Sequence, residues 1–347
     1  MFKKLILLLP LLSAFASFSQ EFAGIVVDEF GNPLPKANIY FNGSTKGVET
    51  NDDGEFEIQI PEIQNKILVI SYMGYETLYI DDFSRNYQTY QLKPKQESLE
   101  DVVIVDSKIP EEKLLDVFKK LFLGIDPNGK NCVILNEDAI NIRFDPNSNT
   151  VIANSKEDLL ILNERLNYKI RYDLIDFEAK FESDKIKGSQ LIHSFFVGTN
   201  TYQDIGETQK KHEIARSVAF QGSIRHFFQA LYHKSLSSEK FRIVKYKKGV
   251  KGNKIFTFET IGNAQKLNLK DYALRGIEEE DVEEGDDPTY SFVVEYKGYE
   301  ISVLKFNTDH IYINKYGDYA PLQKVLINGE MSYKKLGSML PSDYIYE

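Results

Sequence analysis

The chain has 347 residues, a formal net charge of −10 and one cysteine, Cys132. Its acidic balance argues against binding nucleic acid or anionic lipid, because both require clustered Lys and Arg. A single cysteine excludes an intramolecular disulfide and a cysteine-based zinc site, and the length favours two domains over one.

Residues 1–19 are expected to be a secretion signal that is cleaved. Two lysines precede a short apolar run, and Ser17 and Ser19 supply the small residues that signal peptidase requires before a cut at Gln20. The run is too short to span a membrane, which takes about 20 apolar residues, and no later stretch reaches that length. Because both lysines leave with the signal, the formal charge falls from −10 to −12. We therefore expect an exported chain with no transmembrane segment after signal cleavage.

Residues 20–93 are predicted to form a β-sandwich of seven short strands. Turn residues recur every 8–12 positions or so, as they do in such folds. In the segment 37–42 apolar residues alternate with more polar ones, which predicts that Tyr40 faces away from the core. The run 67–72 is continuously apolar, as expected of a strand covered on both faces.

The turn residues of this segment form a fixed pattern: Gly24, Asp28, Gly31, Pro33, Leu34 and Ala37, then Gly47, Thr50, Gly54 and Phe56, then Tyr72, Gly74 and Tyr75. The pattern resembles the carboxypeptidase-regulatory-like domain, a transthyretin-like (prealbumin-like) β-sandwich, over residues 22–93. The resemblance implies a non-catalytic accessory module, found beside metallocarboxypeptidase domains and in front of many outer-membrane nutrient transporters.

Residues 94–109 are predicted to be a linker that holds one short apolar strand. The tract 99–105, Leu-Glu-Asp-Val-Val-Ile-Val, is similar to the tract that follows this domain in TonB-dependent transporters. The residues that remain are too few for the large barrel found there. The tract has two interpretations, a TonB-binding strand and an ordinary strand that joins the C-terminal sheet, and we favour the second.

Residues 110–347 are predicted to form an α+β domain of antiparallel strands with two main helices. The first helix covers 110–124, where Pro110 suits the first turn and leucines and phenylalanines recur at helical spacing. The second is expected from about Thr208 to Ser235. The tracts 168–174 and 223–228 are similar to an uncharacterised C-terminal region that accompanies the regulatory domain in some exported bacterial proteins. Further strands are expected at 140–144, 168–172, 177–181, 191–196, 241–246, 254–258, 291–296, 301–306, 310–313 and 322–327.

The sequence contains no recognisable metal or catalytic motif. A zinc carboxypeptidase needs a His-x-x-Glu pair, and none of the five histidines has Glu three residues later. His212-Glu213 begins like a His-Glu-x-x-His motif, but Arg216 occupies the position of the second histidine. The acidic turn 51–54 resembles the start of a calcium loop, but a strand pattern follows it. We expect no cofactor, no metal and no catalytic residue.

Two charged features remain. Arg216, Arg225 and His226 could form a patch that holds an anionic group, and the alternative is a solvated helix face with ordinary ion pairs. Residues 278–287 contain eight carboxylates in ten positions, which favours an extended insertion between strands over a weak divalent-cation site.

Together these features favour a non-enzymatic, exported interaction protein of the periplasm or outer membrane. The sandwich would dock an envelope protein, through an exposed strand edge. One alternative is a carbohydrate- or peptide-binding module that uses the aromatic C-terminal sheet. Another is an enzyme whose site the sequence does not reveal.

Overall fold

A computed structural model describes residues 21–61, 67–95, 109–245, 248–250, 256–262, 264–269 and 290–346. The described chain is mainly β, with several antiparallel sheets and three α-helices. Three predicted features lie outside the described residues: the signal at 1–19, the apolar tract at 99–105 and the acidic segment at 278–287.

The N-terminal part is a β-sandwich of seven strands, as predicted. One sheet has the order β4-β1-β7 and the other has the order β3-β2-β5-β6. Phe22, Ile39, Phe41 and Ile70 fill the core between the two sheets. The strands are β1 (Glu21–Val27), β2 (Asn38–Phe41), β3 (Gly47–Glu49), β4 (Glu55–Gln59), β5 (Leu68–Ser71), β6 (Leu78–Ile80) and β7 (Gln88–Gln91).

Two glycines in the sandwich sit where a side chain would not fit. Gly54 closes the turn before β4 at φ +74°, and a Cβ there would lie 2.6 Å from the carbonyl oxygen of Val26. Gly24 lies inside β1, where a Cβ would meet the carbonyl oxygen of Gln88 on β7 at 2.6 Å. The glycine pattern of the sequence therefore reflects close backbone approach within this sandwich.

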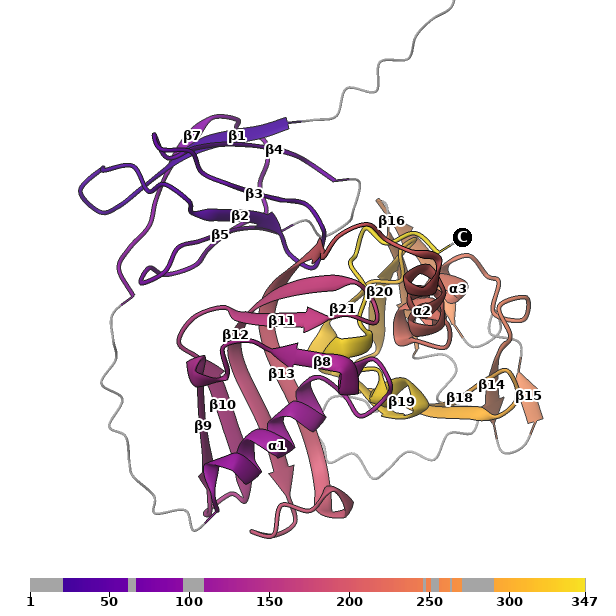
Figure 1. Cartoon of the computed structure of the whole chain (residues 1–347). Coiled ribbons are helices and arrows are strands. Elements are labelled where there is room, and N and C mark those ends of the chain that lie inside the picture. The colour runs from indigo at the N-terminus through magenta and orange to yellow at the C-terminus, as the bar shows by residue number, and fades with distance from the viewer. Residues whose placement is uncertain are drawn as a thin grey trace, which may run out of the picture.

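The middle part is a six-stranded antiparallel sheet with one helix packed against one of its faces. The strand order is β8-β11-β12-β10-β9, and β13 adds to β12. Figure 1 shows α1 lying across this sheet, on the side away from the N-terminal sandwich. The elements are α1 (Glu111–Phe122), β8 (Cys132–Ile134), β9 (Ile140–Asp145), β10 (Thr150–Ser155), β11 (Leu159–Asn163), β12 (Tyr168–Phe181) and β13 (Leu191–Asp204).

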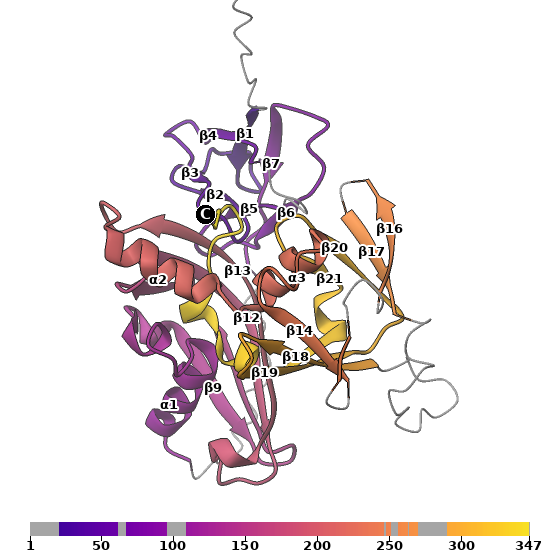
Figure 2. The same ribbon diagram turned by 90° about the vertical axis from the view of Figure 1, so that its right-hand side faces the viewer.

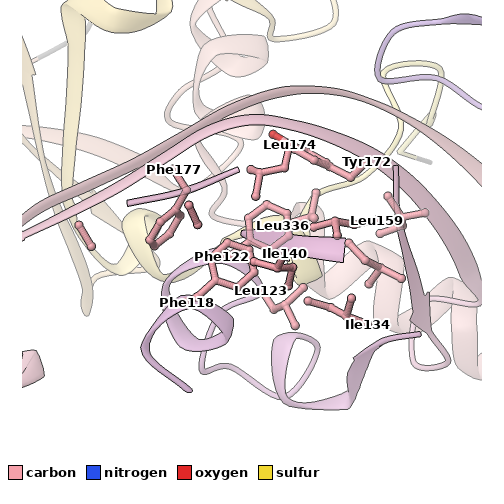
Figure 3. Close-up of a cluster of buried hydrophobic side chains, with 14 of the residues drawn as sticks. Phe118, Phe122, Leu123, Ile134, Ile140, Leu159, Tyr172, Leu174, Phe177 and Leu336 are labelled. Atoms are coloured by element: carbon pink, nitrogen blue, oxygen red, sulfur yellow. The ribbon is translucent and has the colours of Figure 1, made fainter. Parts of the chain in front are cut away.

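Helix α1 supplies the centre of this core. Leu114, Phe118 and Phe122 are buried on one helix face, as the sequence spacing predicts. Phe118 contacts Phe177 of β12 edge-on, with ring centroids 4.9 Å apart, and Figure 3 shows these rings pointing into the sheet. Gly124 adopts φ +103° just after the helix, a backbone conformation that glycine allows and that commonly ends helices.

Strands β12 and β13 are each 14 residues long and form a long hairpin. The sequence predicts separate strands at 168–172 and 177–181, but β12 runs through both. A β-bulge between Leu174 and Asp176 shifts the register, so Ile175 interrupts the apolar alternation without ending the strand.

The C-terminal part has its own core around a third set of strands. One sheet has the order β15-β14-β18-β19-β22 and another the order β16-β17-β20-β21. From the sequence we expect one α+β unit at 110–347, and the described residues of this range pack in two hydrophobic clusters. The strands are β14 (Phe241–Lys245), β15 (Lys248–Val250), β16 (Thr257–Ile261), β17 (Ala264–Asn268), β18 (Tyr290–Tyr296), β19 (Glu300–Phe306), β20 (His310–Asn314), β21 (Tyr319–Ala320) and β22 (Val325–Gly329).

The single helix predicted at 208–235 is wrong, because two helices occupy this segment. They are α2 (Lys210–Phe220) and α3 (Ile224–Tyr232). Gly222 adopts φ +68° between them, and the Ser223 side chain accepts a hydrogen bond from the His226 backbone N–H to begin α3. The break lets α2 pack on the middle core and α3 on the C-terminal core, as Figure 2 shows.

The segment 341–346 joins the three parts. Arg225 of α3 donates to the carbonyl oxygens of Pro341 and Ser342 at 2.6 and 2.7 Å. The Ser342 N–H donates to the carbonyl oxygen of Gly43 in the sandwich at 2.7 Å. Tyr346 stacks on Phe220 of α2, with ring centroids 4.8 Å apart. Among the described residues, no helix has the length and apolar character needed to cross a membrane.

Candidate ligand-binding cleft

A cleft of about 1160 Å³ lies between the sandwich and the middle sheet. One wall comes from the outer face of the sandwich sheet and the loop between β5 and β6. The other wall comes from β9, β10, the start of β11, and β12. The two walls therefore belong to separately packed cores.

Strand β12 orients the polar side chains of the middle-sheet wall. Tyr172 and Leu174 are buried on the α1 side of the sheet. Arg171 and Asp173 alternate with them, and so they point to the opposite face and line the cleft. Strand alternation thus places one cation and one carboxylate side by side on this wall.

Asp158 adds a second carboxylate next to Asp173. The β11–β12 ladder ends at the pair Leu159–Tyr172, and Asp158, which immediately precedes β11, comes close enough to Asp173 of β12 for their like charges to interact. Like charges near each other are unfavourable. The Asn136 side chain fixes this position, because it donates to the Asp158 carbonyl oxygen at 3.0 Å and accepts from the Leu160 N–H at 2.8 Å.

The environment of Asp158 favours its neutral form. Burial, followed by the nearby Asp173 carboxylate, raises the pKa of Asp158 from 3.8 to about 6. Arg171 opposes this shift, but its Nη1 lies 3.8 Å from Asp158 Oδ2, at the limit of an ion pair. Asp173 accepts a hydrogen bond from Thr77 Oγ1 of the sandwich at 3.3 Å. With the nearby Glu157 and Lys95 included, three carboxylates face two cations, which leaves this part of the wall one positive charge short of neutrality.

The sandwich wall is aromatic and carries an unpaired hydroxyl. Tyr72 and Tyr75 line it with ring centroids 5.6 Å apart, and Tyr79 of β6 is 47% exposed. Ser71, at the end of β5, also lines the cleft and is only 7% exposed. Its Oγ has no hydrogen-bond partner within the part of the chain that the structure describes. A buried hydroxyl without a partner costs about 1–3 kcal/mol.

The two walls are held together beside the cleft by contacts with β13. The Tyr40 hydroxyl lies 3.0 Å from Thr199 Oγ1, and the Gly43 N–H donates to the Asn200 carbonyl oxygen at 2.7 Å. Tyr40 faces away from the sandwich core, as predicted, but it is only 2% exposed because β13 covers that face. The sequence of the sandwich alone does not show that β13 packs on the face where Tyr40 lies.

The predicted anion patch of Arg216, Arg225 and His226 does not form an open site. Arg216 donates to the Leu166 carbonyl oxygen at 2.8 Å and to Asp204 Oδ1 at 2.5 Å. Its guanidinium also lies over the Tyr168 ring, 3.8 Å from the centroid. Arg225 donates to carbonyl oxygens of the C-terminal segment instead. Both arginines therefore hold separate chain segments in place.

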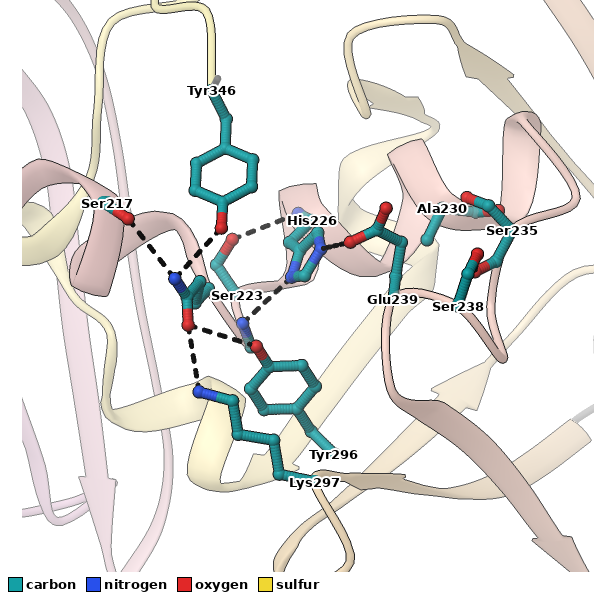
Figure 4. Close-up of polar contacts among 12 residues, drawn as sticks. Ser217, Ser223, His226, Ala230, Ser235, Ser238, Glu239, Tyr296, Lys297 and Tyr346 are labelled. Carbon is teal, nitrogen blue, oxygen red and sulfur yellow. Dashed lines mark hydrogen bonds and ion pairs between the residues drawn. The ribbon is translucent and has the colours of Figure 1, made fainter.

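His226 is buried within the fold rather than directed at a ligand. Its Nδ1 accepts from the Gly222 N–H at 3.1 Å, so the ring proton lies on Nε2, which is 3.2 Å from Glu239 Oε2. Burial lowers the pKa of His226. Figure 4 shows the imidazole between Glu239 and the start of α3. We do not carry the anion-patch prediction further.

Metal ligation finds no support in the described geometry. Among the residues that the structure describes, no group of three or more His, Cys, Asp or Glu side chains could hold a metal ion. The acidic turn at 51–54 is organised by Asn51, whose Oδ1 accepts from the N–H groups of Asp53 and Glu55 at 3.0 and 2.8 Å. These bonds make it an Asx turn.

No local sequence pattern distinguishes Asp158, Arg171, Asp173 or Ser71 as site residues. Arg171 and Asp173 stand in a strand pattern, where polar residues on the non-core face are ordinary. Only the covering of that face by another part of the chain makes them site residues. The Gly222-Ser223 pair, by contrast, is a readable helix stop and start that the prediction of one long helix overlooked.

The N-terminal part of the chain is a β-sandwich, and the comparisons identify its domain type. Residues 22–104 match the family model of the CarboxypepD_reg-like domain, so this part of the chain is a domain of that family. TonB-dependent receptor P39 of Formosa agariphila is 34% identical over 97 residues, which is 28% of this chain and 9% of that protein. TonB-dependent receptor SusC of Bacteroides thetaiotaomicron is 32% identical over 108 residues, or 30% of this chain and 10% of that protein. The chain therefore spans about a tenth of the length of these relatives.

One solved structure also aligns along most of the chain. It is a crystal structure of a proposed carbohydrate binding protein from Bacteroides uniformis, with 9% identity and a TM-score of 0.17, covering 89% of this chain and 98% of that one. A likeness this low supports no argument about fold or ligand.

Proposed function

We propose that this protein is a non-enzymatic, exported protein of the bacterial cell envelope that binds a segment of a partner protein in the cleft between the sandwich and the middle sheet. The observation that carries the proposal is the cleft itself, which has one wall from each of two separately packed cores. A concave site at a domain interface is the usual place for a ligand.

The sandwich wall suits an extended polypeptide. Within the described part of the chain, β6 pairs with β5 alone, so its other edge is open to a further strand. An extended peptide that adds to a sheet edge gains main-chain hydrogen bonds and places alternate side chains toward the wall. Tyr79 of β6 lies on that wall, where it would contact such a side chain.

The envelope location rests on the N-terminal sequence and on the domain type. The expected signal at 1–19 predicts export, and the relatives that share the sandwich domain are TonB-dependent receptors. We take the sandwich to be an adaptor that contributes one wall of the site. The proposal assigns no catalytic step to it.

A second candidate function is hydrolysis by a carboxyl pair, favoured by the raised pKa of Asp158 beside Asp173. Glycoside hydrolases place two carboxyl groups on either side of the scissile bond. Asp158 and Asp173 instead lie next to each other on one wall. We therefore place this candidate second.

Site-directed photo-crosslinking in cells tests the proposal. A photoreactive phenylalanine analogue would replace Tyr79 or Asn154, which lie on opposite walls of the cleft. Phe30, which is 81% exposed on the sandwich and is not part of the cleft, gives the matched control position. We expect both cleft positions to form an adduct with the same envelope protein and the control position not to form it. Adducts that are absent from both cleft positions, or equal at Phe30, would overturn the proposal.

A further inference from the structure

We propose that the cleft recognises a basic side chain, an ammonium or guanidinium group of the bound segment, which lies against Asp158 and Asp173. This inference rests on the proposed function and names the chemistry that the site selects. It is argued from charge, from an unpaired hydroxyl and from the aromatic wall.

The charge balance is the first observation. Beside the carboxylates of Asp158 and Asp173 lie a third carboxylate, Glu157, and two cations, Lys95 and Arg171, with 3.8 Å between Arg171 Nη1 and Asp158 Oδ2. The Asp158 side chain is only 22% exposed, so water screens its charge incompletely. One further positive charge would neutralise the group, and a ligand can bring it into the cleft that both aspartates line.

The unpaired hydroxyl of Ser71 is an independent observation. Ser71 is 93% buried at the cleft wall, and its Oγ is one of two buried side-chain oxygens left without a partner among the described residues. An ammonium or guanidinium group carries several N–H donors, more than two carboxylates need. A donor left over after the carboxylates are satisfied would give the Ser71 oxygen the partner it lacks.

The aromatic wall fits the same ligand. Tyr72 and Tyr75 form a tilted pair on the sandwich side of the cleft, and Tyr79 adds a third ring. A cation near the face of an aromatic ring is attracted by the ring's quadrupole, and more strongly the further it is desolvated. The stem of a long basic side chain is apolar and packs against such rings. A carboxylate wall that faces an aromatic wall is therefore selective for a basic side chain.

The site should bind more weakly in acid. The pKa of Asp158 is raised to about 6, so its charge is present at neutral pH and is lost as the pH falls below that value. A bound cation favours the ionised form and lowers this pKa. Binding therefore releases almost no proton near about pH 7.5 and a fraction of one proton near about pH 5.5. The groups that face Asp158 are Asp173 and Arg171 on β12, Lys95 after β7, Glu157 on its own segment, and Tyr40 and Tyr79 on the sandwich.

Calorimetric titration with a blocked peptide tests the inference. The probe is tetralysine with both termini blocked, and its control is the same peptide with all four side-chain amines acetylated. We expect the acetylated peptide to bind at least about tenfold more weakly, a change of about 1.4 kcal/mol. Asp158→Asn and Asp173→Asn should each weaken tetralysine binding about fivefold or more, since each removes one of the two charges that the ammonium contacts.

Two further variants test whether binding depends on the residues of the cleft or on the overall negative charge of the protein. Glu178→Gln removes a carboxylate from the same strand, β12, outside the cleft lining, and should leave binding unchanged. Ser71→Ala should weaken binding about twofold or more while leaving the fold intact, because it removes an oxygen that has no partner in the protein. Equal binding of the acetylated peptide would overturn the inference. Equal losses in Glu178→Gln and Asp158→Asn would overturn it too.

The two proposals can fail separately. If cleft crosslinks to one envelope protein form but acetylation does not weaken peptide binding, the partner-binding function stands and the basic-side-chain inference is wrong. If tetralysine binds as expected but no cleft crosslink forms, the charge chemistry stands and the partner-binding function is wrong.

Discussion

Replacing Asp158 by Asn should stabilise the protein at neutral pH. The pKa of Asp158 is about 6 in the folded protein against 3.8 for an ordinary aspartate, so folding favours the neutral carboxyl. This contribution is fully present below pH 3.8 and is lost as the pH rises through about 6. A pKa difference of about two units corresponds to about 2–3 kcal/mol between the two ends of that window. Above pH 7 or so, the ionised Asp158 therefore destabilises the fold by that amount.

The assay is urea denaturation of the wild type and of Asp158→Asn at about pH 4 and about pH 7.5. The quantity to compare is the difference in free energy of unfolding between the two proteins, because the other titrating groups are common to both. We expect this difference to move by about 2–3 kcal/mol in favour of the variant as the pH rises. Asp173→Asn supplies a second background, in which the shift should shrink because the neighbouring charge is gone.

A difference that does not change with pH would refute the reasoning. It would mean that the Asp158 carboxyl is solvated in the folded protein. A difference that moves in the opposite direction would mean that Arg171 outweighs burial and holds the carboxylate ionised. Either result would also weaken the charge argument for the cleft. The expected result, in which Asp158→Asn stabilises the fold but weakens binding, would mean that this residue is kept for binding at a cost in stability.

Three further substitutions test the fold, each by urea denaturation. Phe118→Ala removes a fully buried ring and should lower the free energy of unfolding by about 3–5 kcal/mol, whereas Phe30→Ala, at 81% exposure, should change it by less than about 0.5 kcal/mol. Gly222→Ala forces a side chain into φ +68° and a Cβ into a crowded space, and should destabilise by about 2 kcal/mol or more, while Gly188→Ala meets nothing within 4 Å and should be near neutral. Tyr40→Phe removes the hydroxyl that bonds to β13 and should cost about 1 kcal/mol; no measurable loss would show that this bond does not hold the sandwich in place.

The sandwich could be predicted from the sequence because its constraints are local. Gly54 must adopt a positive φ, and the alternation around Ile39 and Phe41 is visible in the sequence itself. Helix α1 is readable for the same reason, since Phe118 and Phe122 fall on one helical face. In each case the information that sets the structure lies within a few residues.

The cleft could not be predicted because it depends on contacts distant in sequence. Asp173 reads as an ordinary exposed residue of a strand until the sandwich, about 100 residues earlier in the chain, comes to lie over it, as the bond from Thr77 shows. Arg225 is the opposite case. As a basic residue on a predicted helix, it suggested a site for an anionic ligand. Its acceptors are backbone carbonyls more than 90 positions further along, which no local pattern announces.

The segment 341–346 has a consequence for how the cleft is assembled. It touches α2, α3 and the β2–β3 turn of the sandwich at once, through Tyr346, Arg225 and Gly43. These residues follow every other described element in the chain, so they are the last of them to leave the ribosome. A nascent chain can fold its sandwich before this segment is made, and the contacts of the segment form only after translation has reached it. The contact of this segment with the sandwich is therefore added after the β13 contacts that hold the two walls together, and a change in these six residues removes it without altering either wall.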